Sequence, residues 1–524
     1  MRDNRIKQEI HLNSGLPEGT KMKRIMYRLI IVSLLLTLLI PPAQAQTPRY
    51  LSASELLPVQ TLLYVEMQGA ELPDSLDSLL AAFLPETLDF SLQSAFEATP
   101  FDAFSAWLGE HIAASVFLPV DMQNPHLIDY VPEAVMIFEI GDESAAGDFI
   151  DAQISTGNLE SVTSSNGNRY RISMLPQMID LQMQRLPGFF IVGTSRGLEY
   201  ISHMLESRTE SLLRSGTFNT VQNTLAPEPL IWVYSPFAEG GIALYADDEK
   251  ISFEYVRFGN ESIRVAAALR PDALQAVPMG AWFVDTAMNA DTDIETALEN
   301  IRRFSRIFAP LDENIENLPV LLESAPRTIA GVSLTEDIVP LFDGGYAAYV
   351  LPNIAGSTFD AALILAPEQA ADVPFILTRI SNRISQTTGL DVELSGQTQY
   401  TLHTASEFLP DVVYGVEDGR LYVGTSGGAV RTLIALENGQ NINRDSRWLR
   451  VLESAPEGTQ RITYMNLRDI TDTVQLAVMS NPDMNSEALL SVLNYLNRFE
   501  SLAVFSRQDT NGIQLTRLVL LLVE

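Results

Sequence analysis

A short segment that occurs twice constrains the fold of this chain more than any other feature. The copies occupy residues 187–201 (PGFFIVGTSRGLEYI) and 418–432 (DGRLYVGTSGGAVRT), and they align without a gap. Among the identical positions, Gly188, Gly193, Thr194, Ser195 and Gly197 recur as Gly419, Gly424, Thr425, Ser426 and Gly428. Repetition at a spacing of roughly 230 residues indicates that one structural unit has been copied in tandem.

The elements around each copy favour an α+β fold with two tandem duplicated units. Strands joined by tight turns are interrupted by helices that do not alternate strictly with them, which is typical of a mainly antiparallel sheet packed with helices. The 524 residues also exceed one ordinary domain. We place the boundary in the proline-containing stretch Arg270–Gly280. The expected units are residues 46–270 and 271–524.

Three predicted elements test this outline. Apolar residues at three-to-four spacing predict a helix over Asp293–Phe308. Ile251–Val256 and Ser262–Leu269 are expected to form a hairpin that closes the first unit. Ser501–Ser506 and Ile513–Val523 are expected to form its counterpart at the end of the second.

The N-terminus has the pattern of an export signal. A basic region around Lys21–Arg28 precedes the apolar run Leu29–Ile40, and Ala43 and Ala45 supply the small-x-small pattern that signal peptidase reads. Because the run is short of the about 20 residues that span a bilayer, cleavage after Ala45 is favoured over an uncleaved anchor. Residues 1–45 are thus predicted to be a signal peptide. A start codon at Met22 or Met26 stays open.

Charge and cysteine content narrow the possible partners. The net charge is −32, and removing residues 1–45 takes away seven of 34 basic and three of 66 acidic residues, giving −36. Such a surface repels nucleic acid and anionic lipid, so we expect no nucleic-acid partner and membrane contact only through an uncleaved signal. The absence of cysteine excludes disulfides, a thiol nucleophile, thiolate metal sites and a lipid-modified cysteine.

Both repeated segments contain Gly-x-Ser-x-Gly, the pattern of a hydrolase nucleophile elbow. A serine nucleophile at Ser195 would need a histidine base, yet only His203 and His403 follow it, and none follows Ser426. The favoured interpretation is structural: glycine permits a tight corner, and Thr or Ser caps the helix after it. The residues of these two corners are Gly193, Thr194 and Ser195 in the first copy and Gly424, Thr425 and Ser426 in the second.

No metal or cofactor site is expected. The four histidines after Ala45 have no ligand spacing, and no phosphate-binding glycine loop occurs. The stretch Asp291–Glu295 resembles the start of a calcium loop but lacks the glycine and the closing glutamate, so an acid-rich helix start is favoured.

Several of these features together resemble one family. They are the export signal, the Leu57–Glu66 opening (LPVQTLLYVE), the Leu108–Ala114 region before a strand, and the strand-Gly-Thr-Ser-helix corner. The chain resembles the bacterial exported proteins of the domain of unknown function 3352 family. That resemblance implies no catalytic residue and no cofactor.

The leading functional hypothesis is a non-enzymatic exported protein, a binding or structural module at the cell surface or outside the cell with an unknown protein or envelope partner. The alternative is a secreted serine hydrolase that uses Ser195 in the Gly-Thr-Ser-Arg-Gly corner. A weaker third hypothesis is a cation-dependent scaffold.

Overall fold

The structure is a computed structural model. It describes residues 52–68, 106–119, 131–162, 168–173, 181–207, 210–247, 249–258, 269, 272–308, 317–353, 359–396, 398–404, 410–480 and 487–523. The signal segment, with Ala43 and Ala45, lies outside these residues. Ser52–Glu524 form one compact unit. No helix in the described ranges has both the length and the apolar character needed to cross a bilayer.

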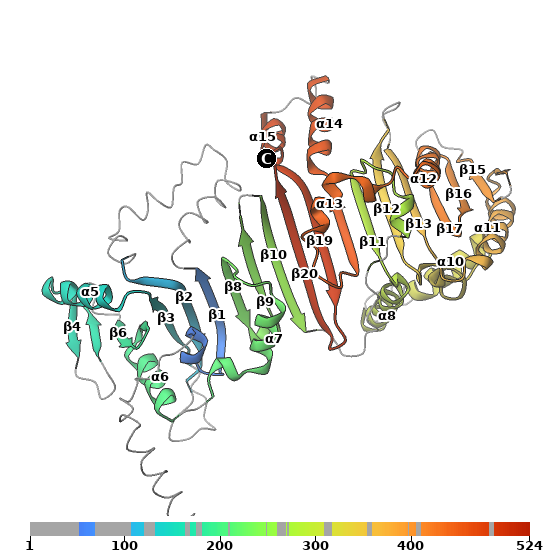
Figure 1. The fold of residues 1–524 in the computed structure, drawn as a ribbon. Coiled ribbons are helices and arrows are strands. Elements are labelled where there is room, and N and C mark those ends of the chain that lie inside the picture. The colour runs from blue at the N-terminus through green and yellow to red at the C-terminus, as the bar shows by residue number, and fades with distance from the viewer. Residues whose placement is uncertain are drawn as a thin grey trace, which may run out of the picture. The chain divides into compact units, whose positions relative to one another are not determined.

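The described residues form one antiparallel sheet of 20 strands (Figure 1). The first ten are β1 Thr61–Gln68, β2 Leu108–Phe117, β3 Glu133–Ile140, β4 Leu159–Val162, β5 Arg169–Ile172, β6 Leu181–Leu186, β7 Phe189–Thr194, β8 Ile231–Ser235, β9 Gly240–Ala246 and β10 Lys250–Phe258. The last ten are β11 Phe283–Ala287, β12 Tyr346–Pro352, β13 Phe359–Leu365, β14 Val392–Ser395, β15 Gln399–Leu402, β16 Val412–Glu417, β17 Arg420–Thr425, β18 Arg461–Met465, β19 Phe499–Gln508 and β20 Ile513–Leu522. The α+β, mainly antiparallel prediction is confirmed.

The strand order of the first ten strands recurs in the last ten. The hydrogen-bonded neighbours run β4-β5-β6-β7-β3-β2-β1-β8-β9-β10. The second series is β14-β15-β16-β17-β13-β12-β11-β18-β19-β20. Each strand of the second series therefore has the neighbours of the strand ten places earlier, and the two series meet where β10 pairs with β20.

Links outside the sheet recur in the same way. The Leu212 N–H donates to the Leu57 carbonyl (2.7 Å), and the Ile442 N–H donates to the Val277 carbonyl (2.9 Å). Next to each link lies an isolated β-bridge, Pro58–Ser211 in one half and Pro278–Asn441 in the other. The repeat thus extends to the loops that anchor the strands.

Helices cover both faces of the sheet. In the first half these are α5 Glu143–Ser155, α6 Ser195–Ser207 and α7 Gly216–Thr224. In the second half they are α8 Ala290–Phe308, α10 Leu318–Ala330, α11 Val373–Thr388, α12 Ser426–Asn438, α13 Ser446–Leu452, α14 Leu467–Ser480 and α15 Glu487–Leu496.

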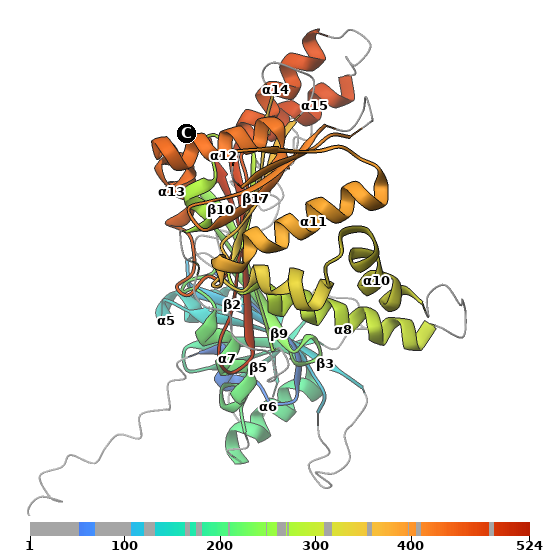
Figure 2. The ribbon, with the colours of Figure 1, turned by 90° about the vertical axis from the view of Figure 1, so that its right-hand side faces the viewer.

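Alternation along the strands gives the second half two cores. Adjacent strand residues point to opposite faces, so Ile364 and Leu365 enter different clusters. Ile364 packs in the cluster that contains Trp448 of α13, whereas Leu365 packs in the cluster that contains Val373 and Leu377 of α11. Figure 2 shows α11 and α13 on opposite sides of the sheet.

Two of the three test elements are confirmed and one is wrong. The predicted helix is α8, and the closing hairpin is β19–β20. The expectation that Ile251–Val256 pair with Ser262–Leu269 is wrong for β10, whose two edges pair with β9 and β20; residues 262–268 lie outside the described residues. The counterpart of β19–β20 is the β9–β10 hairpin. The proposed division at residue 270 stays a prediction.

Candidate functional site

The first repeated corner joins β7 to α6. Gly193 lies against the neighbouring strand, where an added Cβ would come within 2.7 Å of Val135 Cγ1. The Thr194 hydroxyl accepts a hydrogen bond from the Gly197 N–H (3.0 Å) and donates one to Glu133 Oε2. Threonine at this corner therefore satisfies one of the free amides at the start of α6.

The second corner, between β17 and α12, has the same construction. An added Cβ on Gly424 would come within 2.4 Å of the Ala361 carbonyl oxygen, so glycine is required by the close approach of β13. Thr425 is the N-cap, and its hydroxyl accepts from the Gly428 N–H (3.0 Å) and from the Ala361 N–H (3.2 Å). The threonine again ties the helix start to the sheet.

Neither serine has a histidine within hydrogen-bonding distance in the described residues. The Ser195 hydroxyl contacts Glu199 Oε1 (3.3 Å) on its own helix. His203 is exposed on the same helix, about 12 Å further along its axis at about 1.5 Å per residue. Ser426 is exposed at the start of α12.

His403 instead belongs to a separate polar cluster. Its Nδ1 lies 2.9 Å from Asp411 Oδ2 and its Nε2 lies 3.4 Å from Glu393 Oε2. The hydrogen bonds that the His403 ring makes to the carboxylates of Asp411 and then Glu393 raise the pKa of His403. Leu402 pairs with Val412 and Val412 with Thr425, so two strand spacings, about 10 Å, separate this cluster from the second corner.

Sequence reasoning missed one carboxylate at each corner. Glu133 and Asp360 occupy equivalent positions on β3 and β13, with 6% and 4% of their surfaces exposed. Arg196 Nε lies 3.6 Å from Glu133, and Arg431 Nε lies 2.7 Å from Asp360. In the sequence, the feature that could have indicated these two carboxylates is an acidic residue next to the apolar residues of a strand. Each carboxylate lies beside the first turn of a helix, and both have arginine partners that give them a structural role.

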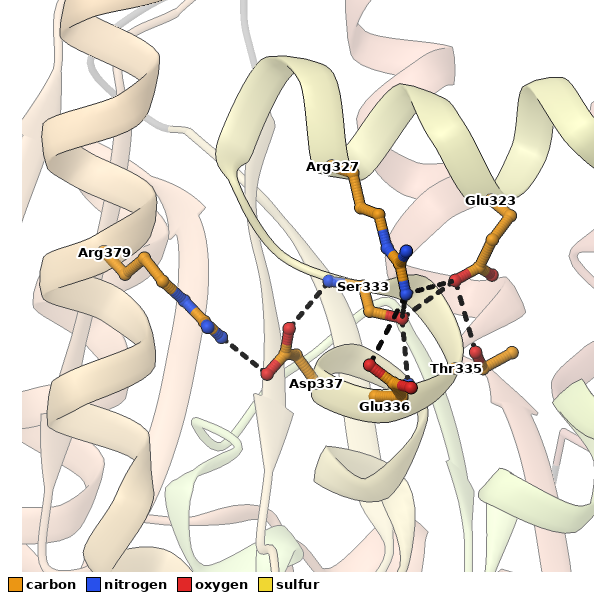
Figure 3. Close-up of polar contacts among 7 residues, drawn as sticks. All are labelled: Glu323, Arg327, Ser333, Thr335, Glu336, Asp337 and Arg379. Carbon is orange, nitrogen blue, oxygen red and sulfur yellow. Dashed lines mark hydrogen bonds and ion pairs between the residues drawn. The ribbon is translucent and has the colours of Figure 1, made fainter.

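A second polar network holds α10 and α11 around the π-helical turn η5, Leu334–Ile338 (Figure 3). The Ser333 hydroxyl accepts from the Glu336 N–H (3.2 Å) and donates to Glu323 Oε1 of α10 (2.8 Å). Asp337 accepts from the Ser333 N–H (2.7 Å) and from Arg379 of α11. Because the Ser333 hydroxyl is engaged as both donor and acceptor, this network is suited to anchoring helices.

Burial would raise the pKa of Asp337, but the Ser333 N–H and the Arg379 guanidinium hold it below its ordinary value.

Asp291 and Asp293, which the sequence placed at an acid-rich helix start, lie in the first turns of α8. The described ranges contain no group of three or more His, Asp or Glu side chains arranged to hold a metal ion.

A cavity of about 340 Å³ lies in the second half, where several strand ends converge. The end of β11 contributes Met288 and Asn289, and the end of β13 contributes Pro367 and Glu368. The remaining lining residues are Asp272, Gly344, Ala366, Asp418, Gly419 and Arg420. This volume is at the lower end of the range typical of small-molecule sites, about 300–1,000 Å³. The sequence could not reveal the cavity, because its walls come from five separate segments.

The comparisons with known proteins identify no family. No family model matches the chain, and no curated protein matches it. Among solved structures, crystal form III of TP0453 is 10% identical with a TM-score of 0.21, and the match covers 74% of this chain and 98% of that one. Crystal form I of TP0453 is 8% identical with the same TM-score, covering 74% and 97%.

Proposed function

We propose that this chain is a non-enzymatic exported protein that acts as a binding or structural module at or outside the cell surface. One observation carries the proposal: in both corners the hydroxyl that is positioned by the fold belongs to threonine and is used in capping. The Ser195 hydroxyl of the hydrolase-like pattern contacts Glu199 on its own helix. His403, which could act as its base, lies in a separate cluster with Asp411.

The repeated strand order supports a duplicated ancestral unit of roughly half the chain. Both copies keep the glycine-threonine corner, although each has its own set of surrounding charges. A corner that serves geometry would be retained in both copies because the strand and the helix must still approach closely. Membership of the domain of unknown function 3352 family and the export signal remain predictions that agree with this function.

The test of the non-enzymatic hypothesis uses an activity-based serine probe. We expect the mature chain to show no turnover on a panel of simple esters and no labelling by a fluorophosphonate. Labelling or turnover that is present in the natural chain and lost in Ser195→Ala would establish the serine hydrolase instead. Thr194→Ser is the matched control, since it keeps the capping hydroxyl and leaves Ser195 in place.

Export is tested separately by fractionation and intact-mass measurement. The predicted mature N-terminus is Gln46, and the protein should be found outside the cytoplasmic membrane. A mature chain that begins upstream of Gln46, or that stays in the cytoplasm, would contradict this part of the proposal.

A further inference from the structure

We propose that the cavity beneath the β16–β17 turn binds a small basic α-amino acid, a compound with one carboxylate and two cationic groups. The inference deepens the proposed binding function and rests on it. It starts from a difference between the two halves, which share a strand order but not this cavity lining.

One hydrogen bond at a strand end of the first half cannot form at the equivalent turn of the second half. In the first half the Ile140 N–H donates to the Gly188 carbonyl (2.8 Å), which closes the β6–β7 turn onto the end of β3. The registers of β3 with β7 and of β13 with β17 place Pro367 at the position of Ile140, and Gly419 at that of Gly188. Proline has no N–H, so this bond cannot form. Pro367 and Gly419 line the cavity instead.

The same alignment shows that charged residues have entered the cavity wall at positions that are uncharged in the first half. Arg420 stands where the first half has Phe189, Asp418 where it has Pro187, and Glu368 where it has Gly141. Phe189 is buried in the first half, with 3% of its surface exposed. The first half therefore has a buried phenylalanine at a position where the second half has a guanidinium, so a site of apolar packing in one half is a polar recess in the other.

The charges of the wall define the ligand class. Asp272, Glu368 and Asp418 form no ion pair within the described residues, and Arg420 is the one cation among the lining side chains. Arg420 donates from Nε to the Asp272 carbonyl (3.0 Å) and from Nη2 to Gln275 Oε1 (3.0 Å). These bonds fix the guanidinium and leave its Nη1 available for a carboxylate. Three carboxylates then remain for cationic groups.

The rest of the lining suits the carbon chain between those groups. Met288, Ala366 and Pro367 provide apolar contact surface within the otherwise polar cavity. A basic amino acid has an α-carboxylate for Arg420, two ammonium groups for the carboxylates, and methylenes for the apolar wall. A plain diamine lacks the α-carboxylate, and an amino acid with an uncharged side chain lacks one of the two ammonium groups.

The test is calorimetry on the mature chain with three probes: L-lysine, 1,5-diaminopentane and L-norleucine. Lysine should bind saturably at one site, and each of the other two should bind at least about tenfold more weakly, since each loses a charge-assisted contact. Equal binding of norleucine, or no saturable heat with lysine, would overturn the proposal.

Variants separate this cavity from general surface charge. Asp418→Asn should weaken lysine binding by about tenfold, whereas Glu417→Gln removes the same charge one residue away, outside the lining, and should leave it unchanged. Arg420→Gln should weaken lysine much more than 1,5-diaminopentane. Equal affinities for Asp418→Asn and the natural chain would refute the assignment. A failure here would leave the esterase and export tests unaffected.

Discussion

The pairing of β10 with β20 contains the most deeply buried ion pair of the described residues, and replacing its arginine should weaken this junction. Glu254 of β10 has 0% of its surface exposed and lies directly opposite Arg517 of β20. Its Oε1 accepts from Arg517 Nε (2.6 Å). Its Oε2 accepts from the Ala226 N–H (2.7 Å) and from the Tyr245 hydroxyl (3.0 Å).

The expected cost of Arg517→Met is about 3 kcal/mol. Removing one partner of a buried pair costs about 3–5 kcal/mol, because an uncompensated charge stays in the interior. Two donors remain on Glu254 Oε2, and 21% of the Arg517 side chain was exposed, so the lower end of that range applies. Methionine keeps apolar volume at the site, so the loss measures the charge more than the packing.

Hydrogen exchange followed by mass spectrometry measures the effect locally, which suits a chain of this length better than a single melting curve. Peptides from residues 250–258 and 513–522 should lose protection by about two orders of magnitude, the equivalent of about 3 kcal/mol. Arg302→Met is the matched control. Arg302 pairs with Glu299, both side chains are about half exposed, and the cost should stay below about 1 kcal/mol.

The result that would refute this reasoning is a loss of protection in Arg517→Met no larger than in Arg302→Met. A second arm uses Glu254→Gln, which removes the charge and keeps oxygen acceptor capacity. In that background Arg517→Met should cost less than it does alone, with a coupling energy above about 1 kcal/mol.

Three further predictions concern the corners and the polar clusters. Thr425→Ala should lower the free energy of unfolding by about 1 kcal/mol through loss of the cap, and Thr425→Ser should largely restore it; identical urea midpoints for the two would contradict the capping role. Asp411→Asn should lower the pKa of His403 in an NMR titration. Because the pKa of His403 is raised in the folded state, its pair with Asp411 stabilises the fold at pH values below the ordinary histidine pKa. That contribution is lost as the pH rises through the folded-state pKa. Arg379→Gln should raise the pH of acid unfolding at a cost of about 0.5 kcal/mol, since a lowered pKa at Asp337 stabilises the fold above its ordinary value and is lost as pH falls; an unchanged acid midpoint would argue against it.

The sequence predicted the elements whose signal is local. The periodic apolar residues of α8, the turn of β19–β20 and the glycine-threonine corners all lie within short windows. β9 was missed because it begins with Gly240 and Gly241, which read as a loop. Both glycines are needed there: an added Cβ would come within 2.1 Å of the Val256 carbonyl oxygen at Gly240, and within 2.5 Å of Val221 Cγ1 at Gly241.

The rest depends on contacts between distant parts of the chain. Glu133 reaches Thr194 from a strand 61 residues earlier. Glu254 meets Arg517 across 263 residues. No periodicity or spacing links such pairs. The error in placing the first closing hairpin has the same origin, because the second neighbour of β10 comes from the far end of the chain.

The junction of β10 with β20 also determines what the sheet leaves unpaired. Because the two series meet through their last strands, the outermost strands are β4 and β14, each only four residues long. An unpaired strand edge is a template on which other chains can stack, and a short one offers few free amides. Because the long edge strands β10 and β20 pair with each other, the part of the chain that the structure describes presents little unpaired strand backbone on which filaments or mispaired dimers could begin.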